Sequence, residues 1–127
     1  MAGYSIDIEK KSIENTNFRE VLFTAPSLQL VVMSLNPGEE IGMETHEKGD
    51  QFFRVEAGQG QAILDGKVTE LPDGMIVMIP EGVEHNIVNT SADQVLKVYT
   101  LYSPPEHEDG TIHKTKAEAD ADEHHAH

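Results

Sequence analysis

Two stretches of this chain decide its fold: GEEIGMETHEKGDQFFRVEAG at residues 38–58 and GMIVMIPEGVEHNIVN at residues 74–89. In each, a glycine precedes a β-rich run, and side chains that commonly bind metal ions accompany it. Between the two stretches, Gln61–Leu64 and Lys67–Leu71 flank Asp65-Gly66, a two-residue loop suited to a type I′ hairpin. The sequence therefore predicts two site-bearing stretches joined by a β-hairpin.

The flanking segments extend the same pattern. Residues 28–35 form a β-rich run that Asn36-Pro37-Gly38 closes, MIVMIP at residues 75–80 reads as a buried strand, and residues 85–88 and 95–102 form a further pair of strands. Short strands with turn residues between them and no amphipathic helix in the middle predict an all-β sandwich or barrel. Residues 1–22 are interpreted as an edge strand or arm, of the kind that often reaches a partner subunit.

The character of the chain changes after Ser103-Pro104-Pro105. We expect a barrel with an N-terminal arm at residues 1–105 and a polar extension at residues 106–127, in which residues 114–123 can form a short exposed helix before the end frays. His107 and His113 lie in a segment that could fold over the barrel mouth, but surface histidines are the favoured interpretation. The terminal EHHAH can bind metal ions on its own account.

Composition excludes several classes of partner. The chain has 127 residues, enough for one domain, and its 9 basic and 23 acidic residues give a formal net charge of −14. Nucleic acid and anionic membranes would be repelled by that charge. The chain has no cysteine, no apolar run long enough to cross a membrane and no apolar leader segment, so the expected compartment is the cytoplasm.

Four side chains form a candidate metal site. Glu44 and His46 share one face of an extended segment, because side chains alternate along a strand. A turn folds Gln51 back beside them, and His85 follows the tight turn Pro80-Glu81-Gly82 that starts another strand. Two imidazoles, a carboxylate and an amide oxygen suit one divalent Mn, Fe, Co, Ni or Zn per chain. Four ligands leave a position for water or substrate, and two histidines with a carboxylate also occur in Fe(II) oxygenases.

Two further roles follow from the alternation of side chains. With Lys97 in solvent, residues 96, 98, 100 and 102 face inward, so Tyr102 is either a hydroxyl in the pocket or a plug for the end of the barrel. Glu44 becomes a candidate general base if it does not bind the metal. Glu44 and Tyr102 are therefore the predicted catalytic residues. Arg54 is expected in a surface or interface ion pair, and Met75 and Met78 in the core or a subunit interface.

The two stretches resemble the two signatures of the cupin superfamily, G-x5-H-x-H-x3,4-E-x6-G and G-x5-P-x-G-x2-H-x3-N. The second signature is matched at all five fixed positions: Gly74, Pro80, Gly82, His85 and Asn89. The first is matched at Gly38, His46 and Gly58, whereas Glu44 stands in place of its first histidine and Gln51 in place of its glutamate. The exchange of roles indicates a rearranged site that keeps a single carboxylate.

The resemblance implies an antiparallel double-stranded β-helix, or jelly-roll barrel, with a metal inside its mouth and a homodimer as the usual assembly. It is closest to compact cupins of the mannose-6-phosphate-isomerase-like type. We therefore predict a metal-dependent isomerase or lyase acting on a small sugar-like or hydroxy-carbonyl compound. An Fe(II)-dependent dioxygenase and a cupin that binds a small molecule without turnover remain the alternatives.

Overall fold

The chain forms nine β-strands between two short helices. In chain order these are α1 (Ile8–Glu14), β1 (Arg19–Thr24), β2 (Gln29–Leu35), β3 (Asp50–Ala57), β4 (Gln59–Leu64), β5 (Lys67–Pro72), β6 (Ile76–Ile79), β7 (His85–Asn89), β8 (Leu96–Ser103), β9 (Ile112–His113) and α2 (Lys116–Ala126). The structure is a computed structural model that describes the backbone of residues 1–126 and the side chains of residues 1–122.

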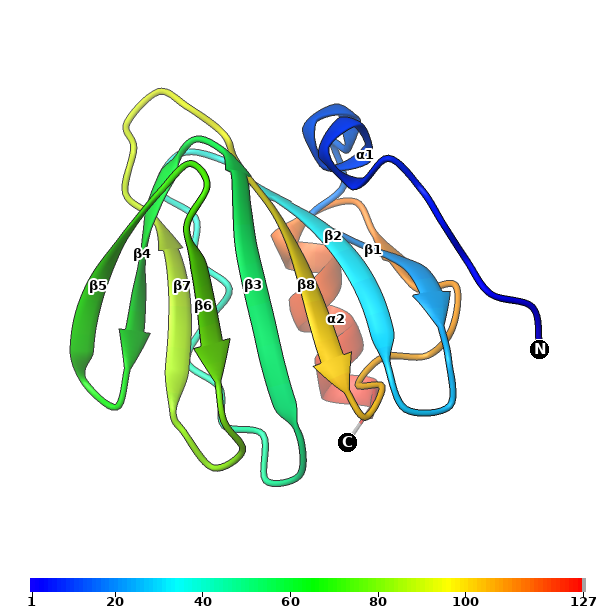
Figure 1. Ribbon diagram of the computed structural model, residues 1–127. Helices are drawn as coiled ribbons and strands as arrows, with labels where there is room; N and C mark the ends of the chain where they lie inside the picture. Colours follow the sequence, from blue (N-terminus) through cyan, green and yellow to red (C-terminus); the bar gives the residue numbers. More distant parts are fainter. Residues whose placement is uncertain (127) are drawn as a thin grey trace.

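The strands make two antiparallel sheets that face each other (Figure 1). The larger sheet has the order β6-β3-β8-β2-β1-β9, and the smaller has the order β5-β4-β7. Consecutive strands pair in β1/β2 and β4/β5, but other neighbours are far apart in sequence, as when β3 pairs with β8, and such pairings distinguish a jelly roll from a simple meander. The arrangement confirms the all-β jelly-roll architecture expected from the sequence.

The predicted hairpin is present between β4 and β5. Leu64 pairs with Lys67, and Asp65 and Gly66 have φ angles of +47° and +82°. A type I′ turn requires positive φ at both central residues, so the Asp-Gly pair fits this loop.

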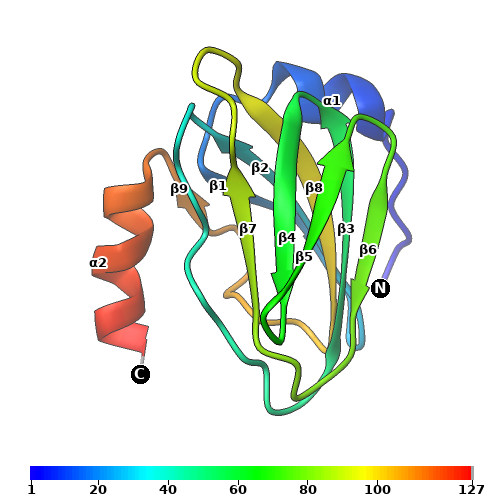
Figure 2. The ribbon, with the colours of Figure 1, turned by 90° about the vertical axis from the view of Figure 1, so that its left-hand side faces the viewer.

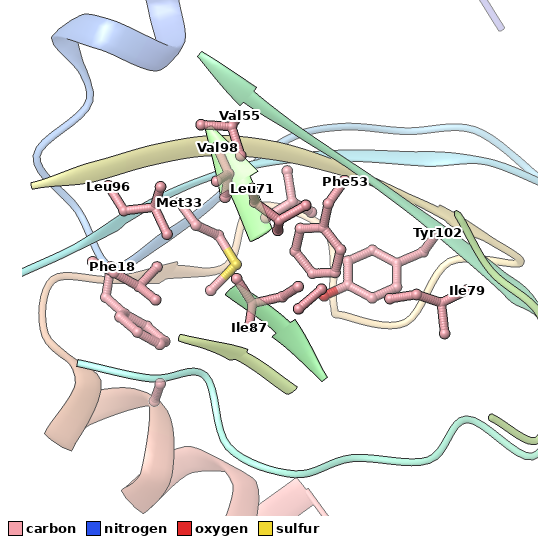
Figure 3. Close-up of a cluster of buried hydrophobic side chains, with 14 of the residues drawn as sticks. Phe18, Met33, Phe53, Val55, Leu71, Ile79, Ile87, Leu96, Val98 and Tyr102 are labelled. Atoms are coloured by element: carbon pink, nitrogen blue, oxygen red, sulfur yellow. The ribbon is translucent and has the colours of Figure 1, made fainter. Parts of the chain in front are cut away.

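The space between the sheets is filled by one hydrophobic cluster (Figure 3). Alternate residues of β8 point into it, and Leu96, Val98, Thr100 and Tyr102 are all buried, as the alternation predicts. Lys97 on the opposite face is partly buried rather than free in solvent, because its ammonium donates to the carbonyl oxygen of Asn15 after α1.

A polar row crosses the larger sheet at the end of the cluster. Tyr102 is the register partner of Gln29 on β2 and of Gln51 on β3, and Gln51 in turn faces Ile79 on β6. Side chains of directly paired residues lie on the same side of a sheet. Gln29, Tyr102 and Gln51 therefore all face the interior at the same end of the barrel.

The segment between β2 and β3 closes the barrel beside β7 (Figure 2). It contains no regular strand, but two isolated bridges attach it, from Glu40 to Val88 and from Glu44 to His85. These bridges bring the first site-bearing stretch into contact with the second.

The interpretation of residues 1–22 as an edge strand is wrong for residues 8–14, which form the helix α1. Asp7 caps this helix by accepting a hydrogen bond from the backbone N–H of Lys10 at 3.1 Å. The alternating apolar residues Tyr4, Ile6 and Ile8, the last of which begins the helix, are too few to define a strand. Upstream of α1, Tyr4 stacks on Phe23 of β1, with ring centroids 4.9 Å apart, so the arm lies on its own sheet.

The strand predicted within residues 75–80 is present as β6, but the expectation that it is buried is wrong. β6 lies at the edge of the larger sheet, where it pairs only with β3. Ile76 and Met78 are 47% and 66% exposed, and within the strand only Ile79 is fully buried. The run is continuously apolar although one of its faces is open in the single chain.

The C-terminal segment packs onto the barrel. β9 pairs with β1, and α2 lies beside β9 with Ala119 only 1% exposed in the hydrophobic cluster (Figure 2). The predicted C-terminal helix is present. The expectation of surface histidines is wrong for His113, which is buried, and for His107, which is partly buried. His124, His125 and His127, expected to bind metal by themselves, lie outside the described side chains.

Candidate metal centre

Glu44, His46 and His85 come together at one end of the barrel. Glu44 and His85 exchange two backbone hydrogen bonds of 2.8 Å, which places their side chains directly across from each other. One ligand atom from each of the three residues lies within 4.8 Å of the other two. A single ion between them could contact all three, so the structure brings together three of the four predicted metal ligands.

His85 is oriented for metal binding through Nε2. Its Nδ1 lies 2.9 Å from the carbonyl oxygen of Val83, and a carbonyl can only accept, so Nδ1 carries the proton and donates it. The lone pair of Nε2 is then available. Burial lowers the pKa of His85 and nearby His46 adds to the effect, while the carbonyl of Val83 opposes it. The imidazole is therefore neutral at neutral pH, the form that binds metals.

Gln51 supplies a buried oxygen without a hydrogen-bond partner. The side chain is 4% exposed, and its amide nitrogen donates to Thr100 Oγ1 at 3.0 Å. The carbonyl oxygen Oε1 has no partner among the described residues. A buried acceptor left unpaired is costly, and a cation would satisfy it. Gln51 thus fits the fourth ligand position, which stays a prediction because no distance joins it to the other three.

His46 stands between two carboxylates. Its Nε2 is 3.4 Å from Glu44 Oε2, but the geometry is not that of a hydrogen bond, and this buried nitrogen has no hydrogen-bond partner in the described part of the chain. Its Nδ1 is 3.6 Å from Glu106 Oε2. The ring of His46 lies 5.2 Å from that of His85, measured between centroids. An unpaired Nε2 facing Glu44 and His85 fits a metal ligand.

The donor set fits a divalent transition metal. Two imidazole nitrogens, one carboxylate and one amide oxygen are the ligand types that Mn, Fe, Co, Ni and Zn accept. Two of the four donor atoms, His46 Nε2 and Gln51 Oε1, are buried and have no hydrogen-bond partner among the residues that the structure describes. This observation supports a metal-binding role more strongly than the spacing of the residues in the sequence.

Tyr102 lies beside this centre, as expected for a hydroxyl in the pocket. Its ring packs edge-on against His46, with centroids 5.9 Å apart, and its hydroxyl is 3.3 Å from His107 Nε2. Burial raises the pKa of Tyr102, with the carboxylates of Glu44 and Glu106 adding to the effect and Arg19 opposing it. The hydroxyl therefore stays protonated and can donate a hydrogen bond toward the centre.

A second polar group adjoins Tyr102 on the side of β1 and β9. Arg19 Nη1 lies 3.2 Å from His113 Nδ1, and His113 Nε2 lies 2.8 Å from Asp122 Oδ2 on α2. Burial, reinforced by Arg19, lowers the pKa of His107 to about 3, so its imidazole is neutral. These contacts tie the C-terminal segment to the barrel.

Sequence reasoning missed Glu106 and Gln29. Gln29 is buried and holds the backbone of residues 106 and 107 through three hydrogen bonds of 2.7–3.1 Å. The available signal was the run SPPEHEDGTIHKT, whose composition does not resemble a simple linker. Arg54, in contrast, behaves as predicted and pairs with Glu56.

A pocket lies where β3 begins and β6 ends. It has a volume of about 210 Å³ and is lined by Asp50, Gln51, Met78, Ile79 and Pro80. Its lining is largely apolar and includes the candidate ligand Gln51.

Within the described residues, no helix is long and apolar enough to cross a membrane.

Comparison with known proteins identifies relatives over nearly the whole chain. The YrkC protein of Bacillus subtilis is 37% identical over 126 residues, covering 94% of this chain and 67% of its own length. The L612 protein of Acanthamoeba polyphaga mimivirus is 41% identical over 113 residues, covering 86% of this chain and 70% of its own length.

The fold is shared with a solved structure. The crystal structure of BH2720 from Bacillus halodurans is 38% identical, with a TM-score of 0.91 over 94% of this chain and 95% of that chain. The sequence profile of the Cupin domain matches residues 31–102, more than half of the chain and including all four candidate ligands. The chain belongs to the cupin family.

Proposed function

We propose that this cupin is a metal-dependent isomerase or lyase acting on a small sugar-like or hydroxy-carbonyl compound. The observation that carries the proposal is the group of ligand atoms from Glu44, His46 and His85 within 4.8 Å, beside a protonated Tyr102 hydroxyl. A metal centre and a fixed proton donor in one buried end of a barrel are the two parts that such chemistry requires.

Each residue of the site would have its own chemical role. His46, His85, Gln51 and Glu44 would hold one divalent transition metal, which supplies Lewis acidity toward a substrate carbonyl. The Tyr102 hydroxyl, fixed by its packing against His46, would donate a hydrogen bond to a substrate oxygen. If Glu44 stays off the metal, its carboxylate would accept the proton removed from the carbon next to the carbonyl and return it to the neighbouring carbon or to the leaving group.

Dimerisation belongs to the same proposal. The open apolar face of β6, with Ile76 and Met78, would be covered by a second copy of the chain. Light scattering on the wild type and on Met78→Glu tests this, and a wild-type mass equal to one chain would contradict it. Cytoplasmic localisation stays a prediction.

The metal centre is tested by elemental analysis of purified protein. The terminal histidines should be replaced by alanine and the tail kept, because truncation near residue 118 would remove Ala119 from the core and Asp122 from its contact with His113. In this background about one metal per chain is expected. The His46→Ala, His85→Ala double variant should hold none, and the control His107→Ala should keep its metal because His107 is not one of the grouped ligands.

The reaction is tested by proton exchange. Removing a proton next to a carbonyl lets solvent deuterium replace it, so NMR in D₂O across a panel of sugars, uronic acids and hydroxy acids should show deuterium uptake with a compound that is a substrate. Uptake should require the bound metal and fall in Tyr102→Phe. Oxygen consumption with Fe(II) that zinc abolishes would favour the dioxygenase instead, and a ligand-induced rise in melting temperature without any product would favour a binding protein.

A further inference from the structure

We infer that Glu106 is a positioning residue of the metal centre: its carboxylate accepts the Nδ1 proton of His46 and thereby holds the imidazole with Nε2 toward the metal. This inference rests on the metal centre of the proposed function, and it assigns a role to the segment that follows β8.

The contact geometry supports this role. Glu106 Oε2 lies 3.6 Å from His46 Nδ1, on the side of the ring opposite to Nε2, which faces Glu44. Histidines that bind metals usually donate their other N–H to a carboxylate or a backbone carbonyl, and this partner fixes the tautomer and the ring orientation. His85 already shows this arrangement through the carbonyl of Val83. Glu106 would give His46 the equivalent partner.

The distance of 3.6 Å is longer than a hydrogen bond, and a metal bound to Nε2 would be expected to shorten it. Such a metal would withdraw electron density from the ring, so the N–H at Nδ1 would become a stronger donor to the carboxylate. Glu106 is exposed enough to move, with its side chain 37% accessible, while its backbone is held in place.

Gln29 provides that hold. Its carbonyl oxygen accepts from the backbone N–H groups of Glu106 at 3.1 Å and His107 at 3.0 Å, and its amide donates to the carbonyl of His107 at 2.7 Å. Gln29 is fully buried and itself is the register partner of Tyr102. The barrel wall therefore holds the backbone that carries Glu106 beside His46.

The test compares Glu106→Gln with Glu108→Gln in the background without terminal histidines. Both variants remove one negative charge from the same segment, and Glu108 is exposed two residues further on, so any long-range effect of charge is shared. Zinc affinity is measured by competition with a chromophoric chelator. The Nδ1–H signal of His46 is followed in long-range ¹H–¹⁵N spectra of the zinc-loaded protein.

We expect Glu106→Gln to weaken zinc binding by roughly tenfold relative to Glu108→Gln and to move the His46 Nδ1–H signal, with the melting temperature of the metal-free protein unchanged. Equal zinc affinities with an unmoved signal would overturn the role of Glu106 and leave the metal centre intact. A loss of affinity matched by a lower melting temperature of the metal-free protein would show a structural role instead. Absence of zinc from the wild type would overturn both the centre and this inference.

Discussion

Replacing Gln29 by methionine should loosen the segment that passes over the metal centre. Methionine has nearly the same length and volume as glutamine but has no amide. It would keep the packing of a fully buried position and remove four hydrogen bonds: the one from Glu106, the two with His107 and the one to Thr24 Oγ1. The substitution therefore isolates hydrogen bonding from cavity formation.

The expected magnitude follows from the groups left without a partner. Three of them are backbone groups of residues 106 and 107. These groups are partly buried, so water can replace some of the hydrogen bonds that they lose. Four hydrogen bonds at about 1 kcal/mol each would contribute about 4 kcal/mol, and partial replacement by water lowers the expected decrease in the free energy of unfolding to about 3 kcal/mol. For a protein of this size that corresponds to a decrease of roughly 1.5 M in the urea midpoint.

Urea titration followed by circular dichroism measures this change. The control is Gln61→Met, since Gln61 makes a single exposed hydrogen bond to Glu70 and should cost less than about 0.5 kcal/mol. Zinc affinity should also fall in Gln29→Met, because Glu106 loses its support. If Gln29→Met matched the control in stability, the segment would be held by something other than Gln29, and the argument for Glu106 would lose its basis.

Three further predictions concern the pH, a close backbone contact and α2. Burial lowers the pKa of His107 to about 3, so below about pH 6.5 the unfolded chain binds more protons than the folded chain. The free energy of unfolding should therefore fall by roughly 1 kcal/mol per pH unit from about pH 6.5 toward pH 4 in the wild type, and less steeply in His107→Gln. Urea midpoints at several pH values measure this difference. Gly58→Ala should lower the free energy of unfolding by more than about 3 kcal/mol, because a Cβ there would lie 2.6 Å from the carbonyl oxygen of Val95. The control Gly74→Ala has a similar φ and no atom within 4 Å of the added Cβ, so it should cost about 1 kcal/mol. Equal melting temperatures of the two variants would contradict this prediction. Ala119→Leu should destabilise the chain by roughly 1–3 kcal/mol in thermal melts if α2 packs on the core as described.

Local sequence patterns predict much of the fold and the three grouped ligands Glu44, His46 and His85. The Asp65-Gly66 turn, the inward set on β8 and the spacing of the two site-bearing stretches all depend on neighbouring residues, so alternation and turn chemistry were sufficient to predict them. Local pattern failed for α1, where a cap overrode a weak alternation, and for β6, where an apolar run lies at a sheet edge.

Strand periodicity and turn residues act over a few positions, and they were enough to predict an all-β sandwich or barrel and the ligand group of Glu44, His46 and His85. The jelly roll itself was expected from the resemblance to the two cupin signatures. The surroundings of those ligands became visible only in the folded chain. Gln29 reaches His107 across 78 positions, and Arg19 reaches His113 across 94. Contacts of that range leave no periodic trace in the sequence, because they depend on how the closed barrel positions a segment that has little regular structure of its own.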